Sequence, residues 1–353
     1  MSEQDIASTE LALAVDDSKG SQRLWVADEH PLPVALLQLL AEQNVYLISN
    51  RHDQVRRANG SGVRAYFNDF DLQHPEQKLW DCIFFRVAKE KAVVHQVINS
   101  AAEVLREKGT LWLAGHKKEG TKTYLAKTED LFGCKAMVKR GKDQLYVGHL
   151  DLYKKGSTLP DDDYHQLRQV QMSESENYWS KPGLFGWGRL DKGSQLLAEN
   201  LKNLDLEFAK SRVLDLGCGY GYLSCKAAEL SPITLQATDN CAAAILACSK
   251  NLEQFKNDNL ICTPSDCADE ITGKFDLVIC NPPFHSGFST SSALHQRFIK
   301  AIRNKLDEKG EALIVVNQFL RLQNICEENG LEIIERIRDN QRHFDLYRLK
   351  HRG

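Results

Sequence analysis

Residues 212–221 read RVLDLGCGYG, an apolar strand-like run that passes directly into a glycine-rich loop. Segments of helix length separate this run from further apolar runs, and such alternation is typical of a parallel sheet with helices on both faces. The further strand-like runs lie at 234–239, 259–264, 275–280, 311–316, 331–337 and 344–350. The sequence therefore predicts an α/β domain of the Rossmann type in this half of the chain.

The first half of the chain repeats this plan. His95-Gln96 precedes a helix-length segment that leads to Lys108-Gly109 and a strand, and about 200 residues later His295-Gln296 and Lys309-Gly310 frame an equivalent segment. The strand-like runs of the first half lie at 23–28, 45–50, 63–68, 79–87, 109–115 and 144–150. We interpret the repeat as a duplicated domain, which predicts an α/β chain of two tandem Rossmann-like domains.

The glycine-rich loop predicts a ligand with a nucleotide-like part. Gly217, Gly219 and Gly221 lack the side chains that would keep such a ligand away from the backbone. Asp239 ends the next strand-like run, where a carboxylate accepts hydrogen bonds from ribose hydroxyls. Asp215 precedes the first glycine, and a carboxylate suits an ammonium group better than a pyrophosphate. The loop therefore favours S-adenosylmethionine as the cofactor over a dinucleotide.

Asp266 follows the third strand-like run of the second half. It is placed to accept a hydrogen bond from an adenine amino group. It is equally placed to cap the N-terminus of a helix in the stretch Pro264-Ser265-Asp266. The sequence alone leaves both interpretations open.

The second motif, Asn281-Pro282-Pro283-Phe284, follows the run at 275–280. Ligands of doubly wound folds bind at the carboxyl ends of the strands, and two prolines make a rigid turn without amide donors. The Asn281 side-chain oxygen and the Pro282 carbonyl are then placed to accept both hydrogens of one amino group. Phe284 offers a flat face on which a base stacks. The motif predicts methyl transfer to an exocyclic amino nitrogen, and the alternative is an ordinary Pro-Pro turn.

These motifs resemble the amino-methyltransferases that carry an N-P-P-[FYW] signature. Within that group the chain is similar to the bacterial 16S rRNA guanine-N2 methyltransferases, which act on guanine 1207 of the small subunit. The likeness also includes His285 and the lead-in to the second domain, which reads Pro182-Gly183-Leu184-Phe185 and continues at Leu190–Leu197. That family has two methyltransferase-like domains, of which only the second is active.

The resemblance implies a role for each matching residue. The cofactor contacts would come from Asp215, Gly217, Gly219 and Asp239, to which the loop pattern adds Gly221 and Asp266. The guanine contacts would come from Asn281, Pro282 and Phe284, with Pro283, His285, Phe185 and Asp191 completing and closing the pocket. The family usually has a Phe-Ser-Arg-type start where this chain reads Phe185-Gly186-Trp187-Gly188-Arg189, which leaves the role of Arg189 open.

We predict a degenerate methyltransferase-like domain at 1–155, a linker at 156–179 and the catalytic domain at 180–353. The first copy has Asp28–Pro33 in place of the glycine-rich loop and Ala88–Lys91 in place of Asn-Pro-Pro-Phe. It is therefore expected neither to bind the cofactor nor to catalyse. The resemblance assigns it to RNA binding and to stabilising the second domain.

Composition sets the remaining expectations. The net charge is −3, yet basic residues gather between Lys117 and Lys142 and again from Arg336 to Arg352, which makes these segments candidates for RNA contact.

No apolar run reaches about 18 residues and no secretory pattern is present, so we expect a cytoplasmic monomer without a membrane contact. Its expected partners are 16S rRNA and the 30S subunit. The ten cysteines include no Cys-x-x-Cys pair, so we expect free thiols and no metal site.

Three other functions fit parts of the sequence. A guanine-N2 methyltransferase of 23S rRNA shares the two-domain plan, but the run Gly193–Leu197 favours the small subunit. An adenine-N6 DNA or glutamine-N5 protein methyltransferase uses a similar acceptor loop, but the extra domain has no recognisable helix-turn-helix or peptide-binding module. A non-enzymatic rRNA-binding assembly factor would need neither the glycine-rich loop nor the Asn-Pro-Pro-Phe motif, so the presence of both argues against this function.

Overall fold

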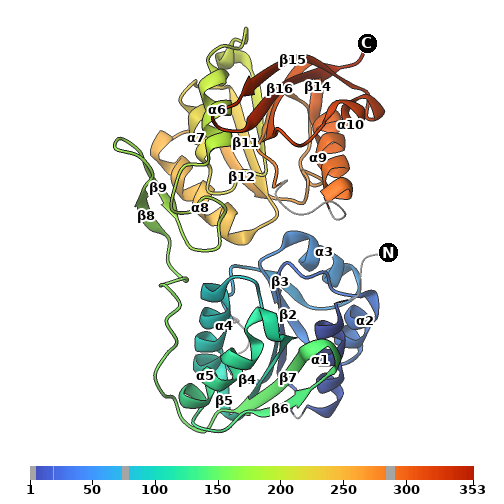
Figure 1. Ribbon diagram of the computed structural model, residues 1–353, viewed down its shortest axis with the longest axis vertical. Coiled ribbons are helices and arrows are strands. Elements are labelled where there is room, and N and C mark those ends of the chain that lie inside the picture. Colours follow the sequence, from blue (N-terminus) through green and yellow to red (C-terminus); the bar gives the residue numbers. More distant parts are fainter. Residues whose placement is uncertain (1–4, 19, 74–78, 284–290) are drawn as a thin grey trace. The chain divides into compact units, whose positions relative to one another are not determined.

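The computed structural model of the protein describes residues 5–18, 20–73, 79–283 and 291–353, except for the side chains of 291 and 292. It divides into two compact units, Met1–Gln166 and Leu167–Gly353 (Figure 1). No helix among the described residues has the length and apolar character needed to span a membrane.

The first unit contains a seven-stranded sheet in the order β3-β2-β1-β4-β5-β7-β6. Strands β1 to β5 run parallel, and β7 and β6 complete the sheet in antiparallel pairs. Its strands are β1 Arg23–Ala27, β2 Tyr46–Ser49, β3 Ala65–Phe67, β4 Trp80–Arg86, β5 Leu105–His116, β6 Met137–Arg140 and β7 Leu145–Asp151. Its helices are α1 Ile6–Asp17, α2 Val34–Glu42, α3 His52–Gly60, α4 Lys91–Val104 and α5 Thr121–Phe132, with short 3-10 helices η1 Lys117–Glu119 and η2 Lys142–Gln144.

The second unit contains an equivalent sheet in the order β12-β11-β10-β13-β14-β16-β15. Its strands are β10 Arg212–Leu216, β11 Thr234–Asp239, β12 Leu260–Pro264, β13 Phe275–Cys280, β14 Leu306–Asn317, β15 Leu331–Asp339 and β16 Phe344–His351. Its helices are α6 Lys192–Leu201, α7 Tyr222–Ala228, α8 Ala242–Leu252, α9 Ser291–Lys305 and α10 Gln323–Glu328, with 3-10 helices η3 Phe208–Lys210 and η4 Glu253–Phe255.

The two sheets have the same topology. Counted within each unit, both run in the strand order 3-2-1-4-5-7-6. The repeated histidines occupy matching helices, since His95 lies on α4 and His295 on α9, and both are buried. This confirms the predicted fold class of two tandem Rossmann-like domains.

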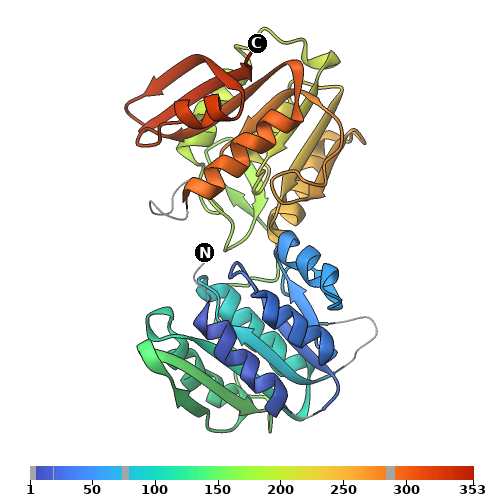
Figure 2. The same cartoon turned by 90° about the vertical axis from the view of Figure 1, so that its right-hand side faces the viewer.

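Both faces of the second sheet are covered by helices. Leu277 and Ile279 of β13 pack on the side of α6, α7 and α8, whereas Val278 and Cys280 pack on the side of α9 and α10. Figure 2 shows α9, in orange, lying across its face of the sheet. Side chains on both faces of such a strand are buried, so apolar residues do not alternate with polar ones along it. This explains why the sequence shows continuous apolar runs.

The strand register brings the two sequence motifs together. Strand β10 pairs in parallel with β13, and Asp215 lies opposite Ile279. Two residues further along each strand are Gly217 and Asn281, where the two loops begin. Both loops therefore emerge side by side at the carboxyl edge of the sheet, where doubly wound folds bind ligands.

Four elements were not predicted from the sequence. They are α1, strand β6, and the strands β8 Arg168–Gln171 and β9 Asn177–Ser180, whose hairpin begins in the segment predicted as a linker and ends one residue beyond it. Strand β6 is exposed along its whole length and β8 has no fully buried residue. Such strands lack the apolar pattern on which sequence-based prediction depends.

Candidate active site

The glycine-rich loop joins β10 to α7 in a conformation that requires glycine. The backbone φ is +54° at Gly219 and +91° at Gly221, a region that side chains rarely adopt. A Cβ atom at Gly219 would meet no heavy atom within 4 Å, so the loop is open there. A Cβ at Gly221 would instead lie 2.8 Å from the Sγ of Cys248 on α8. Gly219 therefore leaves room for a ligand, whereas Gly221 allows the close approach of a helix.

Asp215 lies near the end of β10 with its side chain fully buried. Its Oδ2 accepts a 2.5 Å hydrogen bond from the Oγ of Ser224 on α7, while its Oδ1 has no hydrogen-bond partner among the described residues. Burial raises the pKa of Asp215 to about 7, because an ionised carboxyl loses its hydration there. A buried acceptor without a donor is uncommon, and it suits a ligand that brings a cationic or donor group.

Asp239 ends β11 and is oriented by two backbone amides. Its Oδ2 accepts a 3.0 Å hydrogen bond from the amide of Gly219, and its Oδ1 accepts one of 2.9 Å from the amide of Cys241. Each carboxylate oxygen has two lone pairs. The carboxylate is thus fixed beside the open part of the loop.

Asp266 lies in a turn after β12 and pairs through its Oδ2 with Arg297 of α9. No helix in the described part of the chain begins at Asp266, so the helix-cap interpretation is wrong. The contact of Asp266 with Arg297 could not be predicted from the sequence, because the two residues are 31 positions apart in the chain.

Asn281 lies directly after β13, and its amide group is held from the lead-in segment. Its Nδ2 donates hydrogen bonds of 2.8 Å to the Oδ2 of Asp191 and of 2.7 Å to the Oγ of Ser194. A carboxylate only accepts hydrogen bonds, so the amide nitrogen and not the oxygen must face Asp191. The Oδ1 of Asn281 receives no hydrogen bond from any described residue, which leaves it available as an acceptor.

The rest of the predicted acceptor motif is partly described. Pro282 is buried and Pro283 is exposed. Phe284 and His285 lie outside the described residues. His295 is buried on α9, and this burial lowers its pKa, which favours the neutral imidazole of a structural residue.

The lead-in segment lies against both motifs. A Cβ at Gly186 would be 3.7 Å from the ring of Tyr220 in the glycine-rich loop and 4.0 Å from the Cβ of Asp191. Phe185 is 54% exposed, so a large apolar side chain is left accessible to solvent beside the loop. Asp191 caps the N-terminus of α6 through a 2.8 Å hydrogen bond from the amide of Ser194.

Sequence-based reasoning missed Asn251, which supports the glycine-rich loop from α8. Its Nδ2 donates to the carbonyls of Tyr220, at 2.7 Å, and Trp179, at 2.9 Å. Its Oδ1 accepts a 2.7 Å hydrogen bond from the amide of Trp179. Tyr178 of the same hairpin packs edge-on against Tyr220, with ring centroids 5.6 Å apart. An isolated asparagine in a helix carries no sequence signal for this contact.

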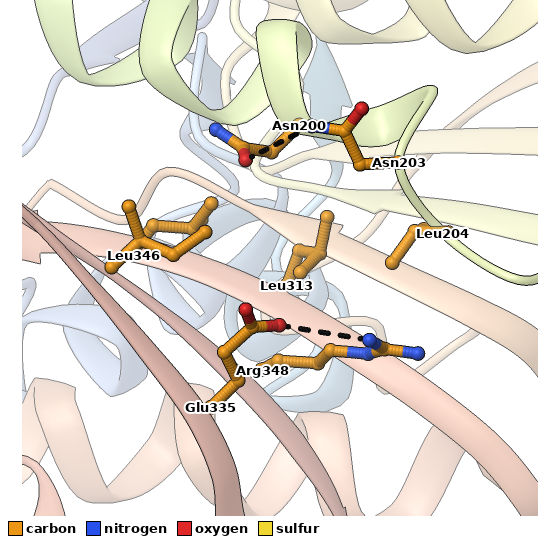
Figure 3. Close-up of a pocket in the computed structure, with 8 residues that line it drawn as sticks. Asn200, Asn203, Leu204, Leu313, Glu335, Leu346 and Arg348 are labelled. Carbon is orange, nitrogen blue, oxygen red and sulfur yellow. Dashed lines mark hydrogen bonds and ion pairs between the residues drawn. The ribbon is translucent and has the colours of Figure 1, made fainter.

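A separate cavity lies between α6, β14 and β16 (Figure 3). Arg348 on its wall pairs with Glu335 at 3.6 Å, and Leu313 and Leu346 form its apolar side. None of the predicted site residues lines this cavity. The candidate site is therefore the open edge formed by the two loops, and not this cavity.

The fold and the two adjacent loops define a methyltransferase of the Rossmann type. In agreement, the family model of the Methyltransferase small domain matches residues 176–347. The chain belongs more narrowly to the ribosomal RNA small subunit methyltransferase C family. A member from Marinomonas sp. (strain MWYL1) is 30% identical over 286 residues, which cover 78% of this chain and 79% of the relative.

Two further comparisons cover nearly the whole chain. A ribosomal RNA small subunit methyltransferase C of Shewanella baltica (strain OS195) is 28% identical over 354 residues, which cover 98% of this chain and 99% of the relative. A solved structure of a T. thermophilus 16S rRNA N2 G1207 methyltransferase, in complex with AdoMet and guanosine, matches with a TM-score of 0.80 and 23% identity. The match covers 99% of this chain and 93% of that one, so both units share its fold. The family predicted from the sequence is confirmed.

Proposed function

We propose that this chain transfers the methyl group of S-adenosylmethionine to the exocyclic N2 of a guanine in 16S rRNA, at the position that corresponds to guanine 1207. The substrate named for the structural relative supports this assignment. The observation that carries the proposal is the fixed amide of Asn281, whose Nδ2 is held by Asp191 and Ser194. Its Oδ1 is thereby left to accept a hydrogen bond from the substrate, at the strand end where ligands bind.

The acceptor residues act by positioning the guanine. Asn281 Oδ1 and the Pro282 carbonyl accept the two hydrogens of the amino group, which turns the nitrogen lone pair toward the methyl donor. Positioning of this kind contributes several kcal/mol to lowering the barrier. Phe284 stacks on the base, a contact worth about 1–3 kcal/mol, while Pro283, His285 and Phe185 complete the pocket. The amino nitrogen loses its proton after transfer, so no strong base is required.

The glycine-rich loop fits the cofactor. S-adenosylmethionine supplies an electrophilic methyl group on its sulfonium sulfur. The Oδ1 of Asp215, which has no partner among the described residues, is suited to accept a hydrogen bond from the ammonium group of the cofactor. The open backbone at Gly219 leaves room for the cofactor. Asp239 accepts the ribose hydroxyls. Asp266 accepts the adenine amino group through Oδ1, since the pair with Arg297 uses Oδ2.

The first unit serves as a degenerate copy. When the two strand registers are matched at the shared Lys-Gly turn, Arg86 at the end of β4 corresponds to Asn281. The expectation that Ala88–Lys91 stands in place of the Asn-Pro-Pro-Phe motif is therefore wrong by two residues, because the sequence alone does not give the strand register. Arg86 is buried and pairs with Asp5 at 3.2 Å and with Glu119 at 2.8 Å. A buried ion-pair network thus occupies the position where the second unit has its acceptor, which supports a role other than catalysis.

The basic residues of the first unit are suited to hold RNA. Within the segment from Lys117 to Lys142, the cations that have no carboxylate within ion-pair distance in the described structure are Lys117, Lys118, Lys122, Lys127, Lys139, Arg140 and Lys142. A hydrogen bond of His116 to the carbonyl of Asp143 brings η1 and η2 together, so that Lys117 and Lys142 belong to one surface. In contrast, Arg336, Arg338, Arg342, Arg348 and Lys350 near the C-terminus pair with carboxylates, and of the arginines and lysines from Arg336 to Arg352 only Arg352 does not pair with a carboxylate of the described residues. Free cations bind phosphates without first breaking an ion pair, which favours the first unit as the RNA-binding surface.

Mapping of modified nucleosides in rRNA tests the proposal. In cells that lack the gene, 16S rRNA is expected to lose one N2-methylguanosine, and the wild-type gene is expected to restore it. Restoration must fail with the Asn281→Ala variant. An unchanged 16S pattern, or a loss confined to 23S rRNA, would refute the proposed substrate.

A further inference from the structure

Three cysteines from separate elements meet next to the glycine-rich loop. Cys218 lies in the loop, Cys248 on α8 and Cys262 on β12, and their Sγ atoms all lie within 4.8 Å of one another. Cys218 and Cys248 are buried, while Cys262 is partly exposed and provides access from solvent. All three are free thiols.

The three sulfurs, all within 4.8 Å of one another, lie close enough together to bind one metal ion in a trigonal site. Metal–sulfur bonds of about 2.3 Å directed to the corners of a triangle place the sulfurs about 4 Å apart. The group contains only thiols, with no histidine or carboxylate of the described residues among its ligand atoms. Thiolates are soft ligands that select copper(I), zinc or iron–sulfur clusters, and structural zinc takes four ligands.

We propose that Cys218, Cys248 and Cys262 form a trigonal thiolate site for a soft monovalent ion, copper(I). The ion forms one bond to each sulfur, and the thiol protons leave to solvent. No change of oxidation state is involved. The three ligands are separate from the acceptor residues Asn281 and Pro282, although Cys218 lies in the glycine-rich loop itself.

Metals bind to the thiolate form of cysteine. Of the three cysteines, Cys262 is the one that solvent reaches, so we expect the ion to enter the site at its sulfur.

The ion would cross-link three segments that are distant in the sequence. It joins the loop to α8 and β12, so the loaded protein is expected to unfold at a higher temperature than the metal-free protein. In the metal-free protein the thiol of Cys248 also donates to the Oγ of Ser224 at 3.7 Å, and Ser224 in turn donates to Asp215. Metal binding removes the proton of Cys248 and therefore removes the first of these two hydrogen bonds.

An anaerobic titration of the full-length, reduced, metal-free protein tests the proposal. The probe is copper(I) buffered by the chromophoric chelator bicinchoninate. We expect one equivalent of copper(I) to be withdrawn from the chelator per chain, X-ray absorption to show three sulfur neighbours at about 2.3 Å, and the unfolding temperature to rise. Cys262→Ser is expected to weaken the affinity by more than about 100-fold, which exceeds the usual cost of losing an outer-shell partner.

Cys267→Ser is the matched control, since Cys267 is also partly exposed but lies outside the cluster. It is expected to retain the wild-type affinity. Cys248→Ser provides a second ligand variant, and the unfolding temperature of each metal-free variant checks its folding. The proposal is overturned if no copper(I) is retained, if Cys262→Ser and Cys267→Ser behave alike, or if the protein takes up zinc with four ligands in preference to copper(I).

Discussion

The Oδ2 of Asp191 lies 2.8 Å from the Nδ2 of Asn281, although the two residues are 90 positions apart. The same oxygen accepts the backbone amide of Ser194 at 2.8 Å and so caps α6. If the amide of Asn281 were turned over, its oxygen would face the carboxylate and be repelled. The helix cap therefore fixes which atom of Asn281 is left to meet the substrate.

Asp191→Asn tests this positioning role. Asparagine caps helices about as well as aspartate, so α6 should stay formed. However, the amide introduced at position 191 can donate as well as accept hydrogen bonds. The variant side chain therefore no longer prevents the amide of Asn281 from turning over. We expect kcat for methyl transfer to fall by up to about 100-fold, with an unchanged Kd for S-adenosylmethionine. Wild-type turnover by a folded Asp191→Asn enzyme would show that the contact has no role in catalysis.

Asn281→Ala removes the acceptor itself. Loss of a group that orients the reacting atom typically costs at least about 100-fold in kcat, so we expect methyl transfer to become undetectable. Calorimetry should still give wild-type binding of S-adenosylmethionine, because the glycine-rich loop is intact. Asn200→Ala is the matched control, since Asn200 lines the separate cavity under α6 (Figure 3). Full turnover by Asn281→Ala would remove this residue from the mechanism.

The raised pKa of Asp215 predicts a pH-dependent affinity for the cofactor. Burial raises this pKa to about 7, so the carboxyl is protonated and neutral below that pH and must release a proton to pair with an ammonium group. The Kd for S-adenosylmethionine should therefore weaken by about tenfold per pH unit below 7, and level off above it until the amino group of the ligand itself loses its proton. Calorimetry in buffers of different ionisation heat should detect the released proton. A Kd that is constant from about pH 5.5 to 8.5 would contradict this assignment.

The full chain should bind one molecule of S-adenosylmethionine and not two. The first unit has no glycine in the loop after β1, and Arg86 occupies the position that corresponds to Asn281. Calorimetric titration of the intact protein measures this stoichiometry directly. A second site with micromolar affinity would mean that the first unit is not a degenerate copy.

The lysines of the first unit should determine how RNA binding responds to salt. Each phosphate contact contributes about 0.9 to the slope of log affinity against log salt concentration on duplex nucleic acid. Lys117→Glu with Lys142→Glu should therefore reduce that slope by about 2 and weaken rRNA binding, without a change in cofactor affinity. Lys135→Glu is the matched control, because Lys135 is exposed but already paired with Glu129 at 2.6 Å. If Lys135→Glu changed the salt dependence of RNA binding as much as the double variant does, Lys117 and Lys142 would not form the RNA-binding surface.

Most of the sheet could be predicted because its signal is local. The runs at 234–239 and 275–280 coincide with β11 and β13, and the repeated His-Gln and Lys-Gly pairs predicted two units that have the same strand order. Strand β6 was missed because it is exposed along its whole length, and β8 because it has no fully buried residue. Strand β9 buries Tyr178 but is only four residues long, which is too short for a clear alternation. Their pairing depends on backbone hydrogen bonds to a neighbour, which leave no periodicity in the sequence.

The sequence by itself determined the fold class, the family and the two motifs. A glycine-rich loop and a turn with two prolines are set by neighbouring residues, so both can be recognised in the sequence. Only the tertiary structure decided which distant side chains meet at those turns. It joined Asp191 to Asn281, Arg297 to Asp266, and Cys218 to Cys248 and Cys262. Such contacts depend on how strands and helices pack in space, so they cannot be predicted from the spacing of the residues along the chain.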